Sequence, residues 1–109
     1  MIFLTILQNL AGKWDKKSYE GKDAGEALGK MRADLTAMRD SDLEGAMVEQ
    51  GFKETRTIIR KGGEWDIATD WAININDNGC GEIEEHPTRE AVIDRFLAIC
   101  AESGEQWDL

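Results

Sequence analysis

The side chains best placed to do chemistry are carboxylates near the C-terminal end of the chain. They lie on the last expected hairpin and the final expected helix: Asp77, Glu82, Glu84, Glu85, Glu90 and Asp94. Carboxylates spaced in this way could imitate a run of phosphates and occupy a surface that normally holds nucleic acid. We take these residues as the candidate partner-binding site and assign no residue a catalytic role.

The charge of the chain is concentrated at the same end. From Glu64 to Leu109 there are twelve Asp or Glu residues against Arg89 and Arg95, whereas residues 1–63 carry eleven Lys or Arg against ten acids. The net charge of −9 argues against direct binding to nucleic acid or to an anionic membrane, because affinity for phosphates requires Lys and Arg. A basic protein is the better-matched partner.

Two patterns resemble metal sites but are incomplete. Residues 74–85 have the spacing of a calcium-binding loop with Glu85 at its last place, but Asn74 stands where Asp is required and a strand pattern precedes it. His86 beside Glu84 offers a single imidazole, which is ordinary for a polar linker. We therefore expect no metal and no cofactor.

Nucleophilic catalysis is poorly supported, because the chain has a single histidine. His86 would be the only imidazole base for a serine or for Cys80, and no third group orients such a pair. The glycines of residues 21–30 lack the spacing of a phosphate-binding loop. We expect a protein that is not an enzyme.

Composition predicts one folded domain over residues 1–109. Four Trp and three Phe at regular apolar spacing argue against disorder. Cys80 and Cys100 fit no zinc or redox spacing; we favour two reduced thiols, with one disulfide as the open alternative. No targeting or membrane-spanning segment is visible, so we expect a soluble cytoplasmic protein.

Apolar periodicity predicts a helical N-terminal half, residues 1–51. Residues 1–11 fit the period of a strand as well as that of a helix, and we favour the helix. Asp23 is the expected N-cap of the next helix, and Gly51 the left-handed end of the one after it. The elements expected in this half are a helix at 1–11, a loop at 12–23, a helix at 24–39 and, after a cap at Asp40 or Ser41, a short helix at 41–50.

After Gly51 the period changes to that of strands, which predicts hairpins followed by a final helix over residues 52–104. Thr88 is the expected N-cap of that helix. The elements expected in this half are strands at 52–60, 65–75 and 81–85, a helix at 88–103 and a polar tail at 105–109.

The first hairpin is expected to neutralise part of the acidic charge. We expect a loop of three residues at 62–64, since a two-residue loop would set charged side chains beside apolar ones. The preferred register gives two cross-strand pairs of opposite charge, Arg60 with Asp66 and Arg56 with Asp70. Such pairs are mildly stabilising, so the two aspartates are left out of the candidate site.

The second hairpin is expected to leave its acids without a basic neighbour. A loop of three residues at 77–79 would pair Ile73 with Ile83 on the buried face. Glu82 and Glu84 would then point outward. Uncompensated like charge costs stability, so its presence favours a functional reason.

The four tryptophans fall into two pairs. Trp65 and Trp71 lie on the apolar face of the 65–75 strand and are expected in the core. Trp14 and Trp107 lie in polar segments near the termini. Two alternatives are open for each of these: it closes over the core, or it serves as an interface anchor.

We expect an α+β fold in which a three-stranded antiparallel sheet packs against two to four helices. In size, acidity, tryptophan content and architecture the chain is similar to small phage-encoded inhibitors of host defence, the anti-restriction and anti-CRISPR class. The resemblance rests on no residue motif and transfers no site residue. It implies a non-enzymatic inhibitor or adaptor, a nucleic-acid mimic that engages a basic protein. The alternative is an accessory or structural domain that self-associates through an apolar patch such as Trp14, Trp107 or residues 2–10.

Overall fold

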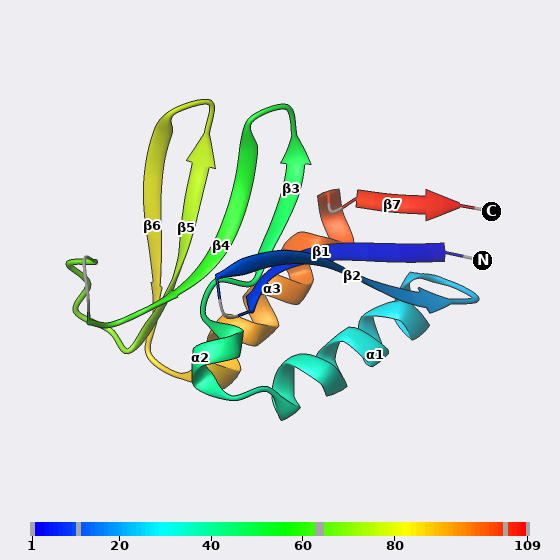
Figure 1. Ribbon diagram of the computed structural model, residues 1–109, viewed down its shortest axis with the longest axis horizontal. Coiled ribbons are helices and arrows are strands. Elements are labelled where there is room, and N and C mark those ends of the chain that lie inside the picture. The colour runs from blue at the N-terminus through cyan, green and yellow to red at the C-terminus, as the bar shows by residue number, and fades with distance from the viewer. Residues whose placement is uncertain (1, 11, 63–64, 104, 109) are drawn as a thin grey trace.

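The computed structural model describes residues 2–10, 12–62, 65–103 and 105–108. Within these ranges the chain is mainly β-structure (Figure 1). The elements are β1 (Ile2–Leu10), β2 (Lys13–Gly21), α1 (Ala24–Ala37), α2 (Asp40–Leu43), β3 (Met47–Gly51), β4 (Glu54–Arg60), β5 (Trp71–Asp77), β6 (Cys80–His86), α3 (Arg89–Ser103) and β7 (Glu105–Asp108).

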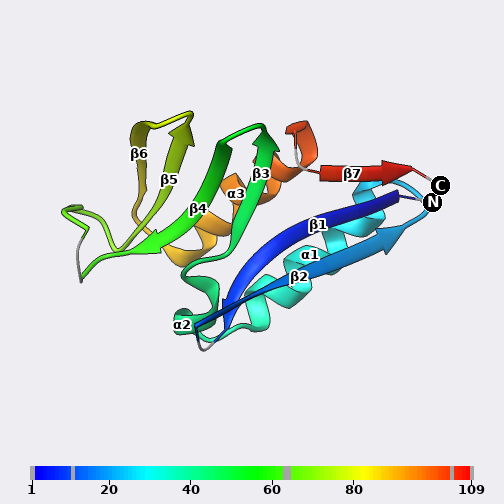
Figure 2. The ribbon, with the colours of Figure 1, turned by 45° about the horizontal axis from the view of Figure 1, so that its top comes forward.

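The described strands form one antiparallel, seven-stranded sheet in the order β2-β1-β3-β4-β5-β6, and β7 pairs with β1 outside this path. Figure 2 shows α1 beneath β1 and β2, and α3 behind the strands β3 to β6. The class is therefore α+β, but the expected three-stranded sheet is wrong. The difference arises because the N-terminal half supplies three of the strands and the C-terminal tail a fourth.

Residues 2–10 form β1, an interior strand that pairs with β2, β3 and β7, which corrects the expected N-terminal helix. Leu4, Ile6 and Gln8 are fully buried on the helix side of the sheet. Every second residue is therefore buried, which is the pattern of a strand and not of a helix. The segment expected as a loop at 12–23 is β2, paired with β1 along its whole length. Its polar composition fits an edge strand, where charged side chains face solvent.

The first long helix is confirmed, and the second is much shorter than expected. Asp23 caps α1, because its Oδ1 accepts the Glu26 amide at 2.9 Å. The helix expected at 41–50 ends at Leu43, and Gly51 lies in β3 instead of closing a helix. Val48 is buried in that strand, so sheet pairing replaces the expected helical packing.

The strand expected at 65–75 begins only at Trp71, so the expected register of the first hairpin is wrong. Arg60 pairs with Trp71 instead of Asp66, and the described residues 61, 62 and 65–70 belong to the connection 61–70 between the two strands. Residues 63 and 64 of the expected three-residue loop lie outside the described residues. Ile67 from this connection packs against Ile59 on the face of the sheet opposite the helices. Packing in this second, small apolar cluster explains why the connection 61–70 folds over the sheet and does not continue as a strand.

The turn between β5 and β6 has two residues instead of the expected three. Asn78 and Gly79 both adopt positive φ, 53° and 92°, as a type I′ turn requires. Ile73 therefore pairs with Glu84, and Asn74 with Ile83. Because side chains alternate between faces, this one-residue shift moves every side chain of β6 to the other face.

The final helix α3 is confirmed, including its cap: Thr88 Oγ1 accepts the Ala91 amide at 3.1 Å. Phe96, Val92 and Cys100 of this helix are fully buried in the main core. The expected polar tail is instead β7, which pairs with Ile2–Thr5 of β1. Both chain ends described thus lie in neighbouring strands (Figure 1).

Candidate functional site: the carboxylates around β6

Glu84 lies on the helix side of β6, opposite Ile73. Its Oε1 accepts a hydrogen bond from Arg95 Nε of α3 and contacts His86 Nε2, each at 2.8 Å. Burial tends to raise the pKa of this carboxyl, but the hydrogen bonds from Arg95 and His86 outweigh it and lower the pKa overall. Glu84 therefore forms a structural ion pair with Arg95 and is not the outward-facing acid that the sequence predicted.

Glu85 lies on the opposite face of β6 and holds the connection 61–70 in place. Its Oε1 accepts the amides of Ala68 and Thr69 at 2.6 and 3.2 Å. These backbone hydrogen bonds lower the pKa of the Glu85 carboxyl. This carboxylate is therefore engaged by the protein itself.

Two more of the candidate acids are paired with arginines. Asp77 binds Arg56 Nη1 at 2.7 Å, and Asp94 of α3 binds Arg32 Nη1 of α1 at 2.5 Å. The remaining candidates, Glu82 and Glu90, are exposed and have no hydrogen-bond or ion-pair partner among the residues that the structure describes. The six expected site residues thus do not act as one uncompensated patch.

Asp66 and Asp70 were expected to be neutralised, and the structure reverses this. Both are exposed in the connection 61–70, and neither carboxylate has an ion-pair partner within the described part of the chain. Their expected partners are used elsewhere: Arg56 binds Asp77, and Arg60 binds acids of α2 and the segment after it. No sequence signal distinguishes these partners, because the choice depends on strand register.

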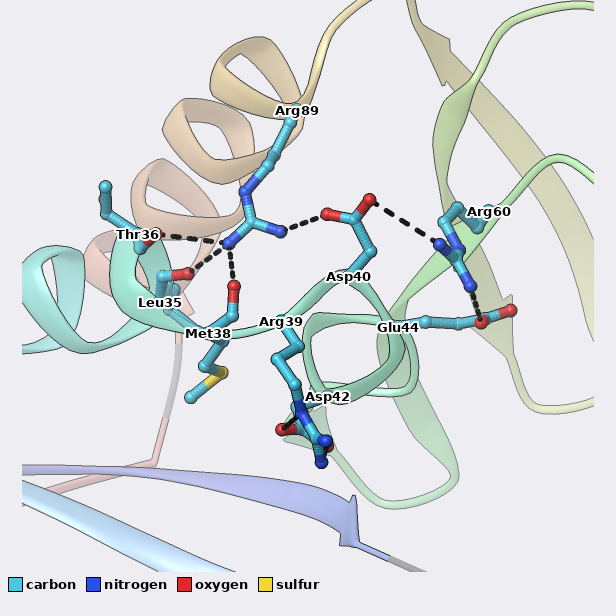
Figure 3. A network of polar contacts seen from close by, with 9 residues as sticks. All are labelled: Leu35, Thr36, Met38, Arg39, Asp40, Asp42, Glu44, Arg60 and Arg89. Carbon is cyan, nitrogen blue, oxygen red and sulfur yellow. Dashed lines mark hydrogen bonds and ion pairs between the residues drawn. The ribbon is translucent and has the colours of Figure 1, made fainter.

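Arg60 and Arg89 share one carboxylate, Asp40, at the start of α2 (Figure 3). Arg89 Nη1 donates to Asp40 Oδ1 at 2.6 Å, and Arg60 lies 3.6 Å from Oδ2. Arg60 also lies 3.4 Å from Glu44 Oε1. The guanidinium groups lie 5.8 and 5.9 Å from the ring centre of the buried Trp71, within cation–π range.

Arg89 also closes the C-terminal end of α1. Its Nη2 donates to the carbonyls of Leu35, Thr36 and Met38 at 2.9, 3.2 and 2.5 Å (Figure 3). The last turn of α1 contains no basic residue, so a cation from α3 satisfies its free carbonyls and its helix dipole. The network ties α1, α2, α3 and β4 together.

Around β6, the described side-chain carboxylates that remain without a partner define what we call the exposed acidic surface: Asp66, Asp70, Glu82 and Glu90. They come from the connection 61–70, from β6 and from the start of α3. In Figure 1 these segments lie on the same side of the molecule, at the β6 edge of the sheet. Glu82 and Glu90 were among the candidates expected from the sequence, whereas Asp66 and Asp70 had been left out of the candidate site.

The described residues contain no group of His, Cys, Asp and Glu that could hold a metal ion. Cys80 and Cys100 are both free thiols, one exposed and one buried. Burial raises the pKa of the Cys100 thiol to about 12, which keeps it protonated and unreactive near neutral pH. Within the described ranges, no helix is long and apolar enough to cross a membrane.

The tryptophans follow the expectations only in part. Trp71 is buried in the main core as expected, but Trp65 packs on the second cluster and is only half-buried. Trp14 is 53% exposed. Trp107 pairs with Phe3 through the backbone of β7, and its side chain lies outside the described atoms.

Comparison with known proteins gives no relative. No protein-family model, no curated protein and no solved structure matches this chain.

We predict that Arg89→Ala lowers the free energy of unfolding by about 2–3 kcal/mol, because it leaves three carbonyls at the end of α1 without their donor and Asp40 with only the longer contact to Arg60. Arg32→Ala is the matched control, since its ion pair is more than half exposed and should contribute less than about 1 kcal/mol. Urea unfolding measures both. Equal losses in the two variants would show that the network is not a structural centre.

We predict that Glu85→Ala detaches the connection 61–70 from β6. Hydrogen exchange of the Ala68 and Thr69 amides should accelerate, because both lose their acceptor. Glu82→Ala, on the same strand, should leave these amides unchanged. Protection of both amides that persists in Glu85→Ala would exclude the anchoring role.

Proposed function

We propose that this protein is a non-enzymatic binder that engages a basic protein through the exposed acidic surface. The observation that supports this most is the combination of a net charge of −9 with Asp66, Asp70, Glu82 and Glu90 left without counter-charge among the described residues. A cationic surface supplies the missing counter-charges. Such complementarity accelerates encounter and selects basic partners.

The use of the arginines supports the same proposal. Arg56, Arg60, Arg89 and Arg95 each bind a carboxylate of the chain itself. They therefore do not neutralise the exposed acidic surface. The negative field at the β6 edge is consequently available to a partner.

An inhibitor or adaptor role, and mimicry of nucleic acid, belong to this proposal. Carboxylates carried by a connection, a strand and a helix start are held on different elements, so their spacing is fixed by the fold. A groove that binds phosphates through Lys and Arg would accept such an array. The position of the negative charge should therefore matter for partner binding, and it can be varied while the net charge is held constant.

The test compares two triple variants with the same net charge. Asp66→Lys/Asp70→Lys/Glu82→Lys reverses the exposed acidic surface. The matched control, Asp15→Lys/Glu20→Lys/Glu49→Lys, reverses three exposed acids of β2 and β3. The partner is captured from a lysate with the unchanged protein at low salt, and its affinity for each variant is then measured.

We expect the first variant to lose at least about tenfold in affinity and the control to lose much less, because contacts are short-ranged at physiological ionic strength. Binding of the unchanged protein should also weaken steeply as salt increases. Equal losses in both variants, or binding that is insensitive to salt, would contradict the proposal. Circular dichroism and melting curves confirm that both variants are folded.

A further inference from the structure

On the face of the sheet that the helices do not cover, a gap separates the β1–β2 hairpin from β4. β1 pairs with β3 at a single position, Leu7 with Met47. Beyond it, β1 continues as a hairpin with β2, while the chain after α2 pairs with β4 through Gly45 N–H to Ile58 O at 2.7 Å. A notch of about 450 Å³ lies between the end of the hairpin and β4. This volume is within the range of specific ligand sites.

Two tryptophans from distant parts of the chain line this notch. Trp14 comes from β2 and Trp65 from the connection 61–70. Trp14 is 53% exposed, and Trp65 is half-buried against the second apolar cluster. An exposed indole costs free energy that a ligand covering it would recover.

The polar side chains of the notch are the amide of Asn9, the carboxylate of Glu44 and the hydroxyls of Ser41 and Thr57. Asn9 lies directly across the strands from Trp14, and its Oδ1 is buried without a hydrogen-bond partner among the residues that the structure describes. Glu44 adds a carboxylate at the rim, one oxygen of which contacts Arg60. Among the described residues that line the notch there is no lysine or arginine.

We propose that the notch binds an arginine side chain of the basic partner, a step that rests on the proposed function. The guanidinium is planar and weakly hydrated, so it stacks on indole rings better than an ammonium does. It carries five donors and no acceptor, which complements the carboxylate of Glu44. The exposed acidic surface attracts the partner, and the notch between Trp14 and Trp65 selects arginine.

The direct test uses a short blocked peptide, Gly-Arg-Gly, and its counterpart with citrulline in place of arginine. Citrulline has nearly the same shape but no charge, two donors fewer and a carbonyl oxygen in place of one NH2 group. Binding is followed through the indole N–H signals of Trp14 and Trp65 in NMR spectra at about 0.5 M salt, where long-range attraction is screened. We expect saturable shifts of both signals with arginine and at least tenfold weaker binding with citrulline.

Trp14→Ala should weaken the affinity for the arginine peptide about fivefold or more, consistent with loss of one cation–π contact. Phe52→Ala is the control, because Phe52 is an exposed aromatic residue, 86% accessible, in the turn between β3 and β4. Equal affinity for the two peptides, or shifts that survive Trp14→Ala unchanged, would overturn the proposal. Shifts confined to Trp71 would do the same.

The two proposals fail in different ways. If the captured partner binds Trp14→Ala as well as the unchanged protein but loses affinity for the acidic-surface variant, the notch proposal is wrong and the proposed function stands. If the arginine peptide occupies the notch while reversal of the acidic surface leaves partner binding unchanged, the proposed function is wrong and the arginine site stands.

Discussion

The two-residue turn at Asn78 and Gly79 determines the face on which each side chain of β6 lies. Because the pair Asp77–Cys80 closes the hairpin, Glu84 points toward α3 and meets Arg95, while Glu85 points to the open face and binds the connection 61–70. With one more residue in the turn, both glutamates would change faces. The ion pair that joins β6 to α3 and the anchor of the connection would then be lost together.

The distribution of charge follows from how the arginines are used. Asp40 receives Arg60 and Arg89, and Arg89 also ends α1 (Figure 3). These contacts join helices to strands and stabilise the tertiary structure. Because the arginines are engaged there, they do not neutralise the exposed acidic surface. The excess of acid at the β6 edge is therefore a consequence of the fold, and it is the property that a basic partner would recognise.

The sequence predicted the parts of this fold that depend on local rules. The cap at Asp23 and the final helix after Thr88 follow from side-chain chemistry within a few residues. The N-terminal strand was missed because a short apolar run fits both periods, and only its neighbours in the sheet decide. The partners of the Glu84 and Asp66 carboxylates depend on the register between strands. A register shift of one residue cannot be predicted from composition.

The register of β6 can be measured directly by nuclear Overhauser effects between α-protons, which are close in the non-hydrogen-bonded pairs of an antiparallel ladder. A two-residue turn predicts strong signals for Asn74 with Ile83 and for Ala72 with Glu85, in agreement with the observed pairing. Signals that instead join Ile73 with Ile83 would contradict this account. Glu84 would then face away from Arg95, and the choice of Asp66, Asp70, Glu82 and Glu90 as the exposed acidic surface would fail.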